Sequence, residues 1–173
     1  MNVAAIGEFL SQLSFRQAVW MLPGAFALHV LEEAPQFTAW VNRYASPNYT
    51  RSYFWRVNLS GLSMTLAFSA IVSAFPSPIL IFLLYALVIV QGTFFNPLFH
   101  AGATAAFGTY SPGLLTSLII HLPLFYFLSA LMFREGLLSH RAGWAAFWLG
   151  GGLHAAVVAR TVFWVPKPAQ KGV

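Results

Sequence analysis

Five long apolar segments, separated by short polar or proline-containing connections, follow one another along this 173-residue chain. Each holds about 20 residues, the length that a helix needs to cross about 30 Å of hydrocarbon. We therefore expect an all-α, polytopic membrane protein with a single domain over residues 1–173, built as a five-helix transmembrane bundle. The expected spans cover approximately residues 15–34, 57–75, 79–102, 113–133 and 143–165.

The connection between the first two apolar segments has a pattern of its own. Phe37, Trp40, Val41 and Tyr44 recur at helical spacing, and Arg43 falls on another face. This predicts a short amphipathic helix in the lipid head-group layer, held there by aromatic side chains. Two interpretations stay open, pure anchoring and a lid over the path of a lipid-like substrate.

The amino-acid composition supports a membrane protein and excludes some kinds of chemistry. Hydrophobic residues make up 58% of the chain and charged residues 8%, whereas soluble domains carry about 25% charged residues. The chain has no Cys, which excludes disulfides, thiolate metal ligands and cysteine nucleophiles. The net charge of +5 fits basic residues that face anionic lipid head groups, and we expect no nucleic-acid partner.

Basic residues also predict an orientation. With five spans, the first loop and the C-terminal tail lie on one side of the membrane, and this side holds more Lys and Arg than the other. The expected location is therefore a bacterial inner (plasma) membrane, with the N-terminus outside and the C-terminus in the cytoplasm. The N-terminus lacks the basic region of a cleavable signal peptide. The compared sets are Arg43, Arg51, Arg56, Lys167 and Lys171 on the first side, and Arg16, Arg134 and Arg141 on the second.

Two adjacent carboxylates, Glu32 and Glu33, lie near the end of the first apolar segment. They are half of the four acidic residues in the chain, and each costs roughly 2.5–3.5 kcal/mol to place in hydrocarbon. His29 precedes them by three and four residues, so all three side chains share one face of a helix. Such groups are typical of a site for a metal, a proton or a substrate.

Further polar residues fall at the same depth. Asn96 and His100 lie late in the third segment, His121 lies early in the fourth, and His154 lies near the middle of the fifth. Because successive spans run in opposite directions, all four residues belong to the same half of the bilayer as the glutamate pair. This favours one buried site of histidine and carboxylate ligands, which suits Zn, Fe or Mn.

These residues predict a metal site in which His29, Glu33 and His100 are ligands and His154 completes the set. We expect a divalent ion, with Zn favoured over Fe or Mn. A two-metal arrangement stays open, although carboxylate-bridged di-iron bundles use about four carboxylates and only two are near here.

Other residues are assigned catalytic roles. Glu32 is the expected general base, by analogy with the glutamate of His-x-x-Glu-His metalloproteases. Asn96 and Tyr110 are expected to stabilise developing negative charge. His121 and Arg160 stay undecided between structural roles and membership of the site.

Three ordered motifs carry a resemblance. They are His29-x-x-Glu32-Glu33, Asn96-x-x-x-His100 and Tyr110-x-Pro112-Gly113. Over about residues 20–123 the chain resembles the HXXEE domain family of small membrane proteins. The resemblance implies a shared site, but it names no reaction, because no activity is established for the family.

The expected function is a metal-dependent intramembrane enzyme, a hydrolase that acts on a lipid or membrane-embedded substrate. One alternative is a histidine- and carboxylate-ligated iron oxidoreductase of the hydroxylase or desaturase type. Another is a proton- or cation-coupled transporter, which five spans without a repeat make a weaker hypothesis. The sequence leaves the oligomeric state undetermined.

Overall fold

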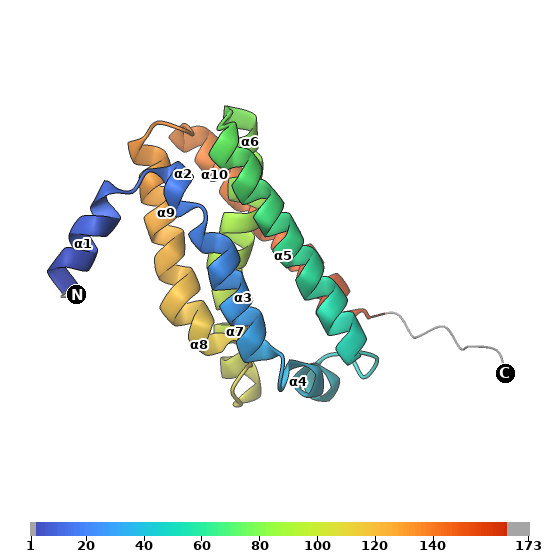
Figure 1. Ribbon diagram of the computed structural model, residues 1–173. Helices are drawn as coiled ribbons and strands as arrows, with labels where there is room; N and C mark the ends of the chain where they lie inside the picture. The colour runs from blue at the N-terminus through green and yellow to red at the C-terminus, as the bar shows by residue number, and fades with distance from the viewer. Residues whose placement is uncertain (1–2, 166–173) are drawn as a thin grey trace.

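The computed structural model describes residues 3–165, and every regular element in that range is helical (Figure 1). Lys167 and Lys171, which the predicted orientation used, lie outside the described residues. The elements, in chain order, are α1 (Val3–Gln12), α2 (Phe15–Ala18), α3 (Met21–Glu33), α4 (Phe37–Tyr44), α5 (Arg51–Ala74), α6 (Pro78–Leu84), η1 (Tyr85–Phe95), α7 (Asn96–Phe107), α8 (Leu114–Thr116), η2 (Ser117–His121), α9 (Leu122–Arg134), α10 (His140–Val158) and η3 (Ala159–Phe163).

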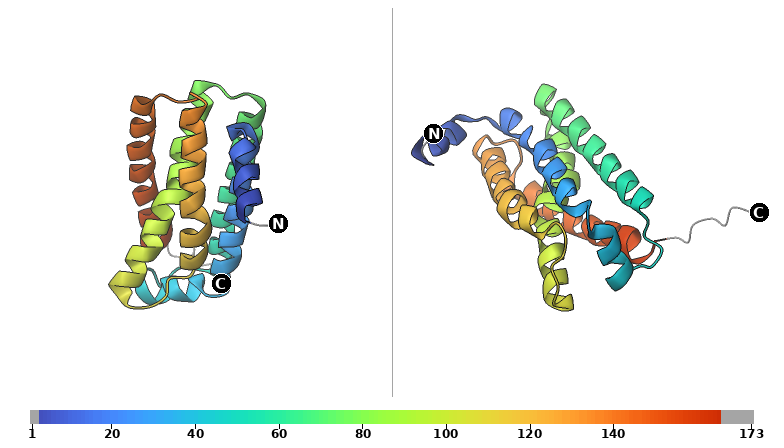
Figure 2. Two further views of the ribbon diagram at one scale, coloured as in Figure 1. Left: turned by 90° about the vertical axis from the view of Figure 1, so that its left-hand side faces the viewer. Right: turned by 60° about the horizontal axis from the view of Figure 1, so that its bottom comes forward.

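Four helices in the described range are long and apolar enough to cross a membrane. They are Arg51–Ala74, Pro78–Phe107, Leu114–Arg134 and His140–Phe163. Each overlaps one of the last four predicted spans, and they run side by side between two ends of the molecule (Figure 2). The prediction of membrane-spanning helices is therefore confirmed for four segments by length and composition.

The first predicted span is not one continuous helix, and this corrects the sequence-based expectation. It is divided into α2 and α3 by a turn at Val19 and Trp20. Pro23 has no N–H to donate to the carbonyl of Val19 four residues earlier. That carbonyl instead accepts from the backbone N–H of Leu22, at 3.1 Å, and from the Ser69 hydroxyl of α5, at 3.2 Å. A contact from another helix therefore stabilises the break.

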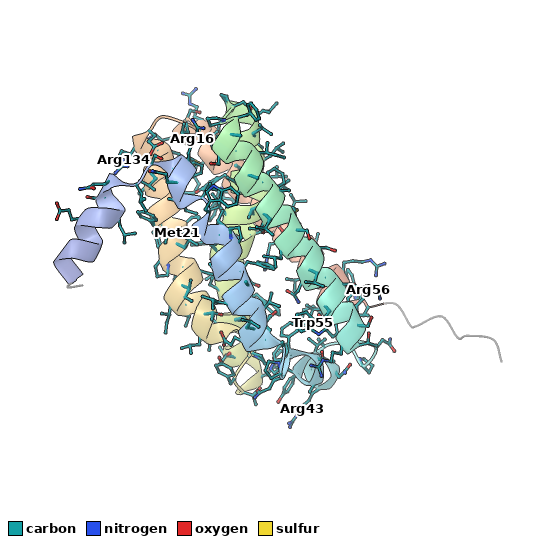
Figure 3. All side chains as sticks on the ribbon, in the orientation of Figure 1. Arg16, Met21, Arg43, Trp55, Arg56 and Arg134 are labelled. Atoms are coloured by element: carbon teal, nitrogen blue, oxygen red, sulfur yellow. The ribbon has the colours of Figure 1, made fainter. Side chains whose placement is uncertain are left out.

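The short helix predicted in the first loop is present as α4, which lies across one end of the bundle (Figure 2). Its apolar side buries Phe37, Trp40 and Val41 against a cluster that includes Tyr49 and Phe54. Arg43, Trp55 and Arg56 lie at this end of the bundle, and Arg16 and Arg134 lie at the opposite end (Figure 3).

Three stretches of the long helices are wound as π-helix, namely η1, η2 and η3. The first two end just before a proline, at Phe95 before Pro97 and at His121 before Pro123. Because proline cannot donate the regular backbone hydrogen bond, the turn before it widens. Helices of this kind are frequent at functional sites, and all three stretches contribute residues to the cavity described below.

The core forms where α10 packs along η1. Gly150 permits this approach, because a Cβ at its position would lie 2.6 Å from the carbonyl oxygen of Ala86. On the other side of the bundle α3 lies between α5 and α9 (Figure 1). This position places the polar end of α3 next to α7, α8 and η2.

Candidate metal centre

Three ionisable side chains converge at the C-terminal end of α3. His29 and Glu33 are one turn apart on α3, and His100 comes from α7. The carboxylate oxygen Oε1 of Glu33 lies 3.5 Å from Nε2 of His29 and 3.5 Å from Nε2 of His100. All three residues are buried, with 3%, 5% and 0% of the surface of His29, Glu33 and His100 exposed.

These separations fit a shared ion better than hydrogen bonds. A hydrogen bond between nitrogen and oxygen is 2.7–3.2 Å long, so 3.5 Å is too far. Ligand atoms bound at about 2.0–2.2 Å around a tetrahedral ion lie about 3.4 Å from one another. The ligand atoms of all three residues lie within 4.8 Å of one another. The donor set of two imidazoles and a carboxylate is that of several catalytic zinc sites.

The hydrogen bonds around His29 define which ring nitrogen carries the lone pair. Thr116 has one hydroxyl proton, and its Oγ1 lies 2.5 Å from Oε2 of Glu32, an oxygen that only accepts when ionised. The Thr116 oxygen therefore accepts a hydrogen bond from Nδ1–H of His29, at 2.9 Å. In the neutral ring, Nε2 then carries the lone pair that a metal requires.

His100 is held in a similar way by a residue of the following loop. Its Nδ1 lies 2.9 Å from Oγ of Ser111, which is itself fully buried. Its Nε2 is buried and has no hydrogen-bond partner among the described residues. A buried polar atom without a partner is costly in a native structure and calls for a ligand. Both histidines thus present Nε2 to Glu33 and are oriented through Nδ1.

Glu32 has a different environment from its neighbour. Its carboxylate accepts hydrogen bonds from the backbone N–H groups of Gly113, Leu115 and Thr116, at 3.1, 3.1 and 2.8 Å. The hydroxyls of Thr116 and Tyr110 also donate to it. Glu32 therefore caps the N-terminus of the helix that begins at α8, where a negative charge is favourable. The structure does not place Glu32 in the group of three.

The predicted Asn96 and Tyr110 lie in different surroundings. Asn96 lines the cavity next to the three ligands, and its amide nitrogen lies 2.9 Å from Nε2 of His29. Tyr110 is about half exposed and hydrogen-bonds to Glu32 outside the cavity lining. Partial burial and the contact with the Glu32 carboxylate raise the pKa of Tyr110. Tyr110 is therefore placed to hold Glu32, away from a substrate in the cavity.

Gly113 brings the loop into direct contact with both histidines. Its backbone has φ +100°, a conformation that side chains disfavour. A Cβ at this position would lie 2.6 Å from Cε1 of His29 and 2.7 Å from Cε1 of His100. Only glycine fits between the two rings, which explains why this residue follows Pro112 in the third motif.

A cavity of about 260 Å³ extends between the helices beside His29 and Glu33. His29, Glu33, His121 and His154 all contribute to its wall. His121 stacks near His29, with ring centroids 4.8 Å apart, and is buried. His154 lies on the cavity wall but is not in the group of three, and its Nε2 has no partner in the described part of the chain. Arg160 donates to the carbonyl of Trp164 and lies outside the cavity lining.

The sequence interpretation missed four contributors to this site: Ser111, Gly113, Thr116 and Tyr49. Ser111 and Gly113 lie within the third motif, where the sequence pattern assigned a role only to Tyr110. Thr116 lies one turn later, and its hydroxyl had no recognisable pattern around it. Tyr49 lies in the loop after α4 and lines the cavity next to Glu33, a position that depends on how the loop folds back.

The motifs that converge here are those of a described protein family. The family model named "Protein of unknown function with HXXEE motif" matches residues 20–128, which is more than half of the chain. No curated protein and no solved structure matches the chain. The matched range includes the HxxEE motif, His100 and the Tyr110–Gly113 loop, all of which meet at one buried site. The chain belongs to the HXXEE family.

Proposed function

We propose that His29, Glu33 and His100 bind one divalent metal ion, with Zn favoured, and that the protein is a membrane hydrolase. The observation that carries the proposal is the 3.5 Å distance from Glu33 to each of the two imidazole nitrogens. The lone pair on Nε2 of His29, which follows from the hydrogen bond at its Nδ1, and the unpaired Nε2 of His100 support it. When bound by three protein ligands, such an ion supplies a water molecule of lowered pKa and polarises a carbonyl.

The residues around the proposed metal ion have separate proposed roles. Asn96 donates to the same nitrogen of His29 that the ion would occupy, so its amide becomes available to a substrate oxygen in the cavity. His154 offers an unpaired ring nitrogen on the cavity wall as a proton acceptor. We assign Glu32 a positioning role, because its five hydrogen-bond donors leave it poorly placed as the general base that the sequence pattern predicted.

We also propose that the segment from α2 to the end of α3 makes a fifth membrane crossing. Residues 15–33 span about 28 Å at 1.5 Å per residue, close to the hydrocarbon thickness of about 30 Å. The end of the bundle that carries Arg43 and Arg56 (Figure 3) then faces the cytoplasm of a bacterial cell, by the bias of basic residues. The metal ligands lie in the cytoplasmic half.

An oxidoreductase is the second candidate, because the same donor set also fits it. Two histidines and one carboxylate with open positions also describe the iron site of non-haem oxygenases. Both candidates need the same three ligands, so the identity of the bound metal separates them.

Elemental analysis of protein purified in mild detergent, without chelator or affinity metal, tests the proposal. We expect about one equivalent of metal per chain in the wild type, and a loss of at least about tenfold in affinity in Glu33→Ala and His100→Ala. His140→Ala, which removes an exposed histidine, is the matched control and should retain the metal. Zn supports the hydrolase and Fe the oxidoreductase. A folded wild type that binds neither ion after both are added back contradicts the metal site.

A further inference from the structure

The cavity beside the three ligands has a lining that restricts what it can bind. Its wall contains no Lys and no Arg within residues 3–165, and Glu33 is its only carboxylate. An anionic group inserted beyond the metal ligands would meet no cation, and its desolvation would be uncompensated. Most of the wall is aliphatic or aromatic, with uncharged polar side chains such as Asn58 and Gln91 interspersed. The lining therefore suits an uncharged and mainly apolar molecule.

The volume limits the part of a ligand that the cavity encloses. An apolar cavity of about 150 Å³ holds benzene. On the same scale, the 260 Å³ found here holds about ten non-hydrogen atoms. This is the size of one short chain segment with a polar group, and it is smaller than a whole membrane lipid.

The cavity reaches the outer surface between two long helices. Met64 of α5 and Val157 of α10 both line it, and they are 41% and 46% exposed. In the described range, the main packing partners of α5 are α2, α3 and α6, whereas α10 packs mainly on η1. The two helices therefore leave a lateral opening, on a side of the molecule where a membrane would present hydrocarbon chains.

One tyrosine belongs to the cavity wall within the described structure. Tyr49 is 4% exposed and lines the cavity together with Glu33. The phenol hydroxyl is a hydrogen-bond donor. A carbonyl oxygen in the cavity would accept a hydrogen bond from it.

We propose that the cavity binds an uncharged carbonyl compound with an aliphatic chain, an ester or amide, which enters between α5 and α10. Tyr49 donates a hydrogen bond to the carbonyl oxygen. This substrate class rests on the proposed function for its chemistry, since the carbonyl would lie next to the three ligands. The binding itself needs only the cavity, so it can be measured separately from metal binding.

The experiment measures binding of three radiolabelled probes to protein in nanodiscs by scintillation proximity, with empty nanodiscs subtracted. The probes are methyl decanoate, the decanoate anion and n-decane, and each is measured with metal-loaded and metal-free protein. We expect saturable binding of the ester to both forms. Decanoate should bind metal-free protein at least about tenfold more weakly, because Glu33 repels it and no cation compensates. Equal binding of decanoate and ester to metal-free protein would overturn the proposal.

Two matched pairs of variants test the opening. Val157→Trp and Met64→Trp should each weaken ester binding at least about tenfold by filling the entrance. Their controls, Leu149→Trp and Leu66→Trp, lie on the same helices at similar exposures of 45% and 43% but do not line the cavity, and they should bind as the wild type does. If each variant and its control lost ester binding to the same extent, the ligand would not enter between α5 and α10.

Tyr49→Phe tests the hydrogen bond. We expect about five- to tenfold weaker binding of methyl decanoate and unchanged binding of n-decane. Tyr53→Phe, which alters the adjacent tyrosine outside the cavity lining, should leave both probes unaffected. Equal weakening of ester and alkane by Tyr49→Phe would show a packing role instead. If the protein bound the ester but took up no metal ion, the proposed function alone would be overturned, whereas a protein that bound metal but not the ester would overturn this inference alone.

Discussion

Gly113→Ala is expected to weaken metal binding at least about 100-fold. Mutation of a residue that only orients a metal ligand already lowers metal affinity about 10–100-fold, and this change displaces two ligand rings directly. The added Cβ would lie 2.6 Å from Cε1 of His29 and 2.7 Å from Cε1 of His100, so the two rings could not keep their positions. The rings must move apart, and Glu33 can no longer lie between them. Competition with a chromophoric zinc chelator measures the affinity.

Gly108→Ala provides the control for this substitution. Gly108 also has a positive φ, +63°, so alanine there carries a similar backbone strain, on the order of 1–3 kcal/mol. Nothing lies within 4 Å of its Cβ position. Gly108→Ala should therefore bind metal as the wild type does, at some cost in thermal stability. If the two variants bound metal equally well, the close packing of the loop on the histidines would not matter for the site.

Glu32→Gln is expected to lower the thermal unfolding temperature of metal-free protein by on the order of 10 °C. An amide replaces one acceptor oxygen with a donor, so it opposes N–H and O–H groups that now point at the carboxylate. Hydrogen bonds to a charged group contribute about 1.5–3 kcal/mol each. The loss should appear without metal, since it comes from the attachment of α3 to the start of α8.

Glu8→Gln is the control, because Glu8 is exposed and its change should leave the unfolding temperature within about 2 °C. If Glu32→Gln instead kept both stability and metal but lost turnover, Glu32 would be the general base that the sequence pattern predicted.

The convergence of His29, Glu33 and His100 could be predicted from sequence because helical periodicity is a strong constraint. The i, i+4 spacing places His29 and Glu33 on one face without any tertiary information. The alternation of spans brings His100 to the same depth. Rotation of a helix about its axis is less constrained by sequence, and for this reason His154 was expected among the ligands but lies on the cavity wall outside the group of three.

The role of Glu32 was harder to predict, because its partners are backbone N–H groups. A peptide N–H carries no sequence signal, and its direction depends on where α8 begins relative to α3. Tyr110 was assigned to the substrate for the same reason, since its actual partner was unknown. The break at Val19 depends on Ser69, 50 residues away in the chain, and so the hydropathy of the first segment suggested one unbroken span.

The most direct test is an X-ray absorption spectrum at the edge of the metal that wild-type protein retains after purification. The account predicts two imidazole ligands, visible by their multiple scattering, with the nitrogen and oxygen ligands all at about 2.0–2.2 Å for zinc. The imidazole contribution should fall by about half in His100→Ala samples reloaded with metal, since one of the two rings is lost. A shell of oxygen atoms alone, or an unchanged imidazole signal in that variant, would contradict the assignment of His29, Glu33 and His100 as the ligands.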